Sequence, residues 1–161
     1  MSNLTIVGID PGVVHTGLVC ITFKPEDWRI EVESQVFDGV KAEDIAAAVV
    51  LMRPDAIYIE DYSTRKNFNN DSAMELAVVQ LKQAMPDAKL IDNAGVATLV
   101  TPATMQVFGV WTFPTPTHHQ DLRSAARIAL LGMLKNQTGQ RELLSLVVKN
   151  YLEGNGWDVV V

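Results

Sequence analysis

The stretch LTIVGIDPGVVHTGLVCITF, residues 4–23, decides how we interpret the rest of the chain. Leu4 to Asp10 is an apolar run of strand length that ends in the turn signal Asp10-Pro11-Gly12. His15 to Phe23 is rich in β-branched and apolar residues and predicts a second strand. The short link between the two runs favours an antiparallel pair, which leaves the acidic residue Asp10 at the end of the first strand.

The segments that follow extend this pair into a sheet. Trp28 to Phe37 alternates in hydropathy and predicts a third antiparallel strand. The period then changes, and Ala42 to Met52 predicts a helix with acidic residues in its first turn. Ala56 to Glu60 is a short apolar run that predicts a fourth strand ending in Glu60, and Asp71 to Met85 predicts an amphipathic helix.

The second half of the chain predicts one more strand and several helices. Pro86-Asp87 indicates the start of a short helix with Gly95 as its C-terminal cap, and Val96 to Thr101 predicts the fifth strand. Further helices are predicted at Pro102 to Phe108, Asp121 to Leu134 and Arg141 to Leu152. The pattern is that of one α/β domain over residues 1–161, with a mixed five-stranded sheet of three antiparallel and then two parallel strands.

The composition indicates a folded protein of the cytoplasm. The chain has 161 residues, of which 48% are hydrophobic and 20% charged. It has no apolar stretch of about 18 residues that predicts a membrane span, and we expect no signal peptide and no membrane partner. Cys20 is the sole cysteine, which excludes a disulfide framework and a cysteine zinc site, and we expect it to be a buried small hydrophobe.

The formal net charge of −6 argues against a simple nucleic-acid coat protein. Proteins that bind DNA through many phosphates usually carry a basic surface. A cluster of metal-binding carboxylates would contribute negative charge that divalent cations neutralise. A local basic patch is also compatible with a negative total.

Asp10 and Glu60 are the first two candidate site residues. If the strands that they end are neighbours, the two carboxylates meet at the same edge of the sheet, where ligands bind in such folds. Buried acidic residues are rare unless they pair or bind metal. Either residue alone is weak evidence for a functional site, because an acidic residue at the end of a strand is common.

The helix around Asp121 supplies the next two candidates. His118 and Asp121 are three residues apart and share a helix face, and imidazole nitrogen with carboxylate oxygen suits Mg²⁺ or Mn²⁺. The small residues Ser124, Ala125 and Ala126 are expected to let this helix lie close to the sheet. The alternative is that Asp121 is a helix N-cap and the histidines are loop residues. His119 is the weaker candidate because it points off this face.

Taken together, these segments resemble the RuvC-type Holliday-junction resolvases, which have a ribonuclease-H-like fold. The pattern GIDPGxxxTG at residues 8–17 also occurs in actin-like ATPases, and its two last glycines suggest a tight turn and a close approach of backbone to a ligand. Actin-like proteins need two subdomains, about twice this length. The strand AIYIE (56–60), the segment VTPATMQ (100–106) and the HxxD helix favour the resolvases, over Leu4 to Leu134.

The resemblance implies symmetric nicking of four-way junctions with two divalent ions, Mg²⁺ or Mn²⁺, in each active site. Asp10 would bridge the ions, Glu60 and Asp121 would each ligate one, and His118 would ligate a metal or activate the water. The acidic composition and the absence of lysines from Met105 to Gly109 suggest a divergent, phage-type member. A broader branched-DNA nuclease and a non-catalytic nucleic-acid-binding member of the same fold remain alternatives.

The expected DNA contacts follow Glu60 in the chain. The segment from Tyr62 to Asn70 interleaves cations with aromatic residues, so it can bind phosphates and stack on unpaired bases. The candidates are Tyr62, Arg65, Lys66 and Phe68, with Phe68 as the preferred wedge. Arg123 and Arg127, four residues apart on the last site helix, are a second candidate pair, although a charged stripe is more often only a solvated face.

A homodimer is expected, because a four-way junction has two-fold symmetry and symmetric cuts need two active sites. By resemblance, the helix from Asp71 to Met85 is the candidate dimer element, with Met74, Leu81 and Met85 as candidate contacts.

Overall fold

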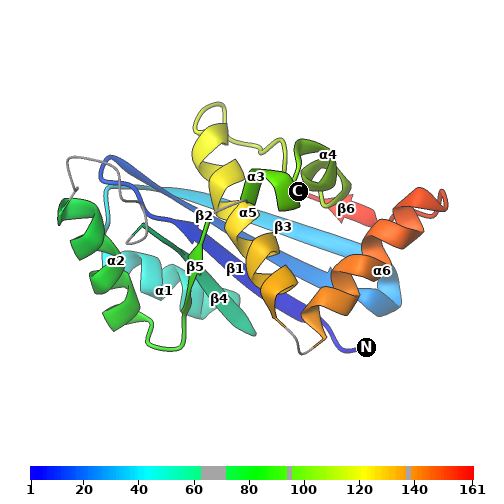
Figure 1. Cartoon of the computed structure of the whole chain (residues 1–161), viewed down its shortest axis with the longest axis horizontal. Coiled ribbons are helices and arrows are strands. Elements are labelled where there is room, and N and C mark those ends of the chain that lie inside the picture. Colours follow the sequence, from blue (N-terminus) through cyan, green and yellow to red (C-terminus); the bar gives the residue numbers. More distant parts are fainter. Residues whose placement is uncertain (63–71, 94–95, 137–138) are drawn as a thin grey trace.

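A computed structural model of the chain describes residues 1–62, 72–93, 96–136 and 139–161. Within these residues one sheet of six strands has the order β5-β4-β1-β2-β3-β6 (Figure 1). The strands are β1 Leu4–Asp10, β2 His15–Lys24, β3 Arg29–Asp38, β4 Ala56–Asp61, β5 Lys89–Asp92 and β6 Asp158–Val160. The expected mixed sheet is confirmed, with six strands rather than five.

β1 is the central strand of the site. It pairs antiparallel with β2 and parallel with β4, so a meander lies on one side of it and parallel strands lie on the other. Ile6 and Val7 are both fully buried, yet they belong to different hydrophobic clusters. Because successive side chains of a strand point to opposite faces, the sheet separates two cores.

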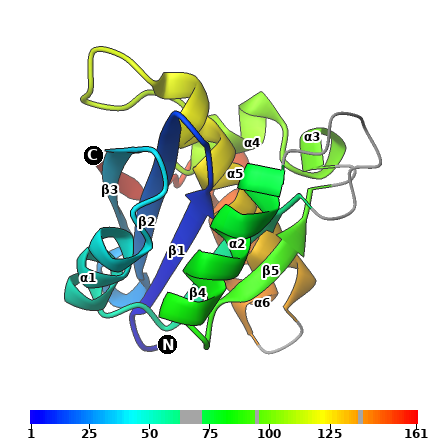
Figure 2. The same cartoon turned by 90° about the vertical axis from the view of Figure 1, so that its left-hand side faces the viewer.

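The helices cover the two faces of the sheet unequally, as Figure 2 shows. They are α1 Ala42–Met52, α2 Ser72–Ala84, α3 Val96–Leu99, α4 Pro102–Val107, α5 His119–Lys135 and α6 Gln140–Leu152. The long helix α5 crosses one face, and its apolar side chains share a cluster with α4 and α6. α1 and α2 belong to the smaller cluster on the opposite face.

The segment after α2 differs from the expectation. Lys89–Asp92 is a strand parallel to β4, where we expected a helix starting at Pro86, and Val96–Leu99 is helical, where we expected the fifth strand. Gly95, the expected cap, lies outside the described residues. β5 is stabilised by its pairing with β4. A four-residue edge segment has no pattern in the sequence that would reveal this pairing. Val96–Leu99 is helical despite the strand preference of its β-branched residues, because the segment leads into the N-cap of α4. There the Thr101 side chain accepts a hydrogen bond from Thr104 N at 3.2 Å.

The sixth strand lies at the end of the chain and was not expected. Asp158–Val160 pairs parallel with β3, with Arg29 opposite Asp158. The preceding Trp157 is 8% exposed and packs edge-on against Trp28, with ring centroids 5.7 Å apart. The strand has three residues, so its hydropathy shows no period that sequence could reveal.

Helix α5 lies in direct backbone contact with the sheet. A Cβ added to Gly8 would overlap the Ala125 carbonyl oxygen, and one added to Gly17 would stand 2.5 Å from the Asp121 carbonyl oxygen. Ala125 and Ala126 are fully buried at this contact, in line with the expected close approach. Gly17 therefore serves the approach of a helix of this chain, where we expected the approach of a ligand.

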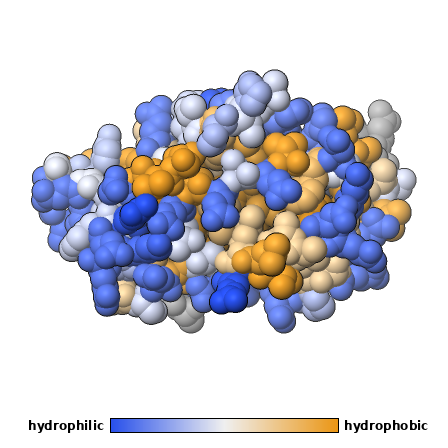
Figure 3. All heavy atoms as spheres, turned by 180° about the vertical axis from the view of Figure 1, so that it is seen from behind, coloured by the Kyte–Doolittle hydropathy of each residue, from blue (hydrophilic) through white to orange (hydrophobic). Residues whose placement is uncertain are grey.

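The described surface is mixed in character. Among the residues that the structure describes, no helix has the length and hydropathy required to span a membrane. Seen from behind, hydrophobic side chains reach the surface among polar ones (Figure 3). On α1, Val50 is 70% exposed and Leu51 is 83% exposed. Cys20 is buried as expected, and burial raises the pKa of its thiol to about 11.

Candidate active site

Strand geometry brings Asp10 and Glu60 to the same place. Ile9 of β1 lies level with Ile59 of β4, so the next residue of each parallel strand, Asp10 and Glu60, is also level at the carboxyl end. Asp10 follows Gly8 by two residues, and Gly8 faces α5. Because side chains alternate along a strand, Asp10 points to the α5 face as well.

Tyr62 joins the two carboxylates. Its hydroxyl lies 2.5 Å from Asp10 Oδ1 and 2.7 Å from Glu60 Oε2. Asn93, which follows β5, donates its side-chain amide to the other oxygen of Glu60. Glu60 is 3% exposed, so both carboxylate oxygens are satisfied inside the protein.

The carboxylate pair changes the protonation of the site. The pKa of Asp10 is raised from 3.8 to about 8, first by burial and then by the hydrogen bond and the negative charge of Glu60. The charge of Asp121 raises it further. Burial raises the pKa of Tyr62 far above its usual range, and the two carboxylates add to this. A hydroxyl has one proton, so both contacts of Tyr62 are hydrogen bonds only when one carboxyl group is protonated.

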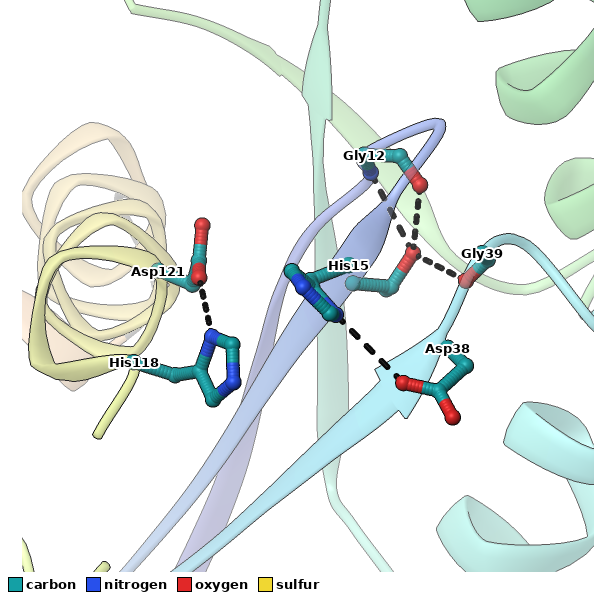
Figure 4. A network of polar contacts seen from close by, with 7 residues as sticks. Gly12, His15, Asp38, Gly39, His118 and Asp121 are labelled. Carbon is teal, nitrogen blue, oxygen red and sulfur yellow. Dashed lines mark hydrogen bonds and ion pairs between the residues drawn. The ribbon is translucent and has the colours of Figure 1, made fainter. Parts of the chain in front are cut away.

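Asp121 reaches the site from α5. It lies in the first turn of the helix, above Gly17, and Gly17 is the β2 residue paired with Asp10. His118 is the N-cap residue and has a left-handed backbone with φ of 63°. Its Nδ1 lies 3.3 Å from Asp121 Oδ2 (Figure 4). The structure thus brings the four expected residues together as two pairs, Asp10 with Glu60 and His118 with Asp121.

Two further residues in or beside the site were not expected. His15, the first residue of β2, packs its ring against His118 with centroids 4.2 Å apart. Its position inside the GIDPGxxxTG pattern is the one signal that could have drawn attention to it. Asn93 follows a strand that the sequence does not reveal, so its place could not be inferred. His119 turns away, with Nε2 2.8 Å from the Thr115 carbonyl oxygen.

Solved structures of other proteins have a fold similar to that of this chain. A structure of Thermus thermophilus RuvC in complex with a Holliday junction substrate matches with a TM-score of 0.61 at 17% identity, covering 80% of this chain and 91% of that chain. Another Thermus thermophilus RuvC structure matches with a TM-score of 0.57 at 17% identity, over 96% and 99% of the two chains. The chain has the RuvC-type, ribonuclease-H-like fold. No family model matches the sequence, and no curated protein does.

The donors of the candidate site have the chemistry that a divalent metal prefers. Among the described residues, no three acidic, histidine or cysteine side chains form a group that could hold a metal ion as they stand. The Tyr62 hydroxyl occupies the space between Asp10 and Glu60. Hard carboxylate oxygens are the ligands that Mg²⁺ and Mn²⁺ prefer. The donor chemistry therefore fits the implied ions.

The expected DNA contacts are placed only in part. Tyr62 has its hydroxyl committed to the carboxylate pair, and Arg65, Lys66 and Phe68 lie outside the described residues. Their contact with DNA stays a prediction.

Arg123 and Arg127 do not form a free pair on the helix surface. Arg123 Nε donates to the Trp111 carbonyl oxygen at 2.7 Å, and its guanidinium carbon lies 3.9 Å above the Trp111 ring. Arg127 Nε is buried without a hydrogen-bond partner in the described part of the chain. Arg123 fixes the 111–117 loop to α5, so any contact of this pair with phosphate would need a rearrangement.

Proposed function

We propose that this chain is a metal-dependent, structure-selective DNA endonuclease that cleaves four-way junctions by symmetric nicking. The observation that carries the proposal is the Asp10–Tyr62–Glu60 arrangement, with Glu60 buried and Asp121 beside it, at the carboxyl ends of β1 and β4. Two carboxyl groups held close together, one of them with a strongly raised pKa, are a common feature of functional sites. The likeness to RuvC supports the fold, and the Holliday junction in one RuvC structure suggests the substrate class.

The residues divide the work by their chemistry. Asp10, Glu60 and Asp121 would hold the ions, Mg²⁺ or Mn²⁺, with two proposed in each site. When bound, such ions stabilise charge on the phosphate and lower the pKa of a bound water. His118 contributes an imidazole whose Nδ1 faces Asp121, which leaves Nε2 available to a water, a metal or the substrate.

Tyr62 prepares the pair for the ions. Its hydroxyl lies within hydrogen-bonding reach of both carboxyl groups, at 2.5 and 2.7 Å. With one carboxyl group protonated, both contacts are hydrogen bonds and the pair carries a single negative charge. Because the phenol stays protonated, it does not add negative charge.

The segment that follows Tyr62 is proposed as the contact with branched DNA. Arg65 and Lys66 supply positive charge a few residues after Glu60 in the sequence of a chain whose net charge is −6, and Phe68 is the proposed wedge. Arg123 and Arg127 remain a secondary proposal.

A homodimer is proposed because the two-fold symmetry of a four-way junction calls for two linked sites. Two of the dimer contacts that we expected, Leu81 and Met85, are wrong. Leu81 is fully buried and Met85 is 6% exposed, because both fill the core between α2 and the sheet. The large apolar residues that α2 exposes are Leu76 at 55% and Val79 at 50%, three positions apart on one face.

The test of the substrate class is cleavage of labelled DNA of different shapes. A four-way junction, a flap and a linear duplex of matched sequence are incubated with the protein and Mg²⁺ or Mn²⁺, beside EDTA controls. We expect metal-dependent cleavage of the junction in preference to the duplex. Equal cleavage of junction and flap would replace the resolvase with a broader branched-DNA nuclease. Binding without cleavage would leave a non-catalytic binding protein.

A further inference from the structure

The backbone around His15 is held firmly. The Gly39 amide donates to the Val14 carbonyl oxygen at 2.6 Å, and the Thr16 hydroxyl donates to the Gly39 carbonyl oxygen at 2.8 Å. Thr16 is fully buried. Its hydroxyl also lies 3.2 Å from the Gly12 amide nitrogen, which ties the hairpin turn to the same point (Figure 4). The residues on both sides of His15 are therefore tied into the sheet, and its Cα has a fixed position.

The His15 ring lies between two groups. Its Nδ1 is 3.4 Å from Asp38 Oδ1 on the neighbouring strand β3, and its other neighbour is the His118 ring, 4.2 Å away and tilted by 60°. The side chains of His15 and His118 are each 34% exposed, whereas Asp38 is 88% exposed. Figure 4 shows His15 between β3 and the start of α5. The Asp38 carboxylate thus lies beside one side of a ring whose opposite side contacts His118, and His15 Nδ1 makes no hydrogen bond in the described part of the chain.

His118 needs such a contact to keep one orientation. Its backbone is in the left-handed region at the helix N-cap, and its contact with Asp121 is long, at 3.3 Å. One long contact restrains rotation of an imidazole weakly. A carboxylate can only accept, so a hydrogen bond to Asp121 requires the proton on His118 Nδ1 and leaves the Nε2 lone pair free in a neutral ring.

We propose that His15 is a positioning residue that fixes the His118 imidazole by ring-to-ring packing. This packing gives the His118 imidazole one orientation, so that its Nε2 has a defined direction at the candidate active site. The packing itself stands on the geometry above, and its catalytic consequence rests on the proposed function.

The packing is tested without DNA or metal. The chain has three histidines, so their ring signals can be assigned by NMR with one substitution each. In the free protein we expect a nuclear Overhauser contact between the rings of His15 and His118. We also expect His15→Ala to shift the His118 ring signals and to leave those of His119 in place. Absence of the contact, or an unmoved His118 signal in a folded variant, would overturn the proposal.

The catalytic consequence is tested by kinetics on a four-way junction with Mg²⁺. We expect His15→Ala to lower kcat about ten- to a hundredfold with KM unchanged, since a small misplacement of a reacting group has an effect of this order. His15→Phe keeps a ring and should recover most of kcat. His119→Gln is the matched control, because this histidine contacts the 113–115 loop.

Two results would contradict the positioning role. A raised KM with normal kcat would make His15 a DNA contact, and a Phe variant as slow as the Ala variant would show that a ring nitrogen is what matters. If the folded wild type cleaves no substrate, the proposed function fails and the catalytic consequence with it. The NMR contact would then decide the packing alone.

Discussion

Gly17 of β2 lies directly beneath Asp121 of α5, so that a Cβ on Gly17 would stand 2.5 Å from the Asp121 carbonyl oxygen. Gly17 is also the partner of Asp10 in the β1–β2 register. The absence of a side chain at this one position therefore allows a carboxylate on a helix to approach a carboxylate on a strand. The site depends on this packing as much as on its acidic residues.

Substituting Gly17 by Ala should push α5 away from the sheet. We expect a loss of about 1–3 kcal/mol in the free energy of unfolding, as is usual for overpacking, together with loss of metal-dependent cleavage. Urea unfolding and junction cleavage measure the two effects. Gly156→Ala is the control, because a Cβ there would meet Tyr151 at an ordinary 3.5 Å. A Gly17→Ala variant that matches this control in both measurements would refute the packing argument.

The pKa of Asp10 predicts how stability depends on pH without metal. The folded-state pKa of about 8 lies above the ordinary aspartate pKa of 3.8, so the protonated form is favoured in the folded state. The resulting stability is fully present below about pH 4 and is lost as the pH rises towards 8. In EDTA, Asp10→Asn should therefore gain stability over the wild type as the pH rises through this window. A stability difference between the two proteins that stays constant from pH 4 to 8 would contradict the raised pKa.

Tyr62→Phe removes the hydroxyl between the two carboxylates. We expect a loss of about 1–3 kcal/mol in the free energy of unfolding without metal, because buried acceptors lose their donor. With saturating Mn²⁺ the loss should shrink, since a cation would replace the hydroxyl. Tyr151→Phe serves as the control, because Tyr151 is 54% exposed. An equal loss with and without Mn²⁺ would show that Tyr62 acts on the fold and not on the ion site.

Cys20 should be inert in the folded protein. Its thiol is 3% exposed, and burial raises its pKa to about 11, so little thiolate forms at pH 8. A thiol reagent such as dithionitrobenzoate should react slowly with the native protein and fast in urea. Rapid reaction under native conditions would show that β2 opens far more readily than its central place in the sheet suggests.

The parts of the fold that the sequence predicts are those with a repeated local pattern. β1, β2 and β3 follow from apolar runs bounded by turns, and α1 begins and ends where the hydropathy indicates. Asp10 and Glu60 could be named because each ends such a run. The edge strands β5 and β6 have four and three residues, and they exist because a neighbouring strand offers unpaired backbone groups.

The finer features of the site arise from tertiary contacts. The basic neighbours of Tyr62 in the chain predict a DNA contact, which stays a prediction, but they do not predict that its hydroxyl contacts Asp10. His15 meets His118 across more than a hundred residues through the β2–β3 register and the approach of α5. No local pattern encodes either contact.

The most direct test of the account is cleavage of a labelled four-way junction by wild type and Asp10→Asn in Mg²⁺, with the nicks mapped on all four strands. The account predicts paired nicks at symmetric positions in the wild type and none in Asp10→Asn, with both proteins folded. Nicks that persist in Asp10→Asn, or a folded wild type that cuts no junction, would contradict it.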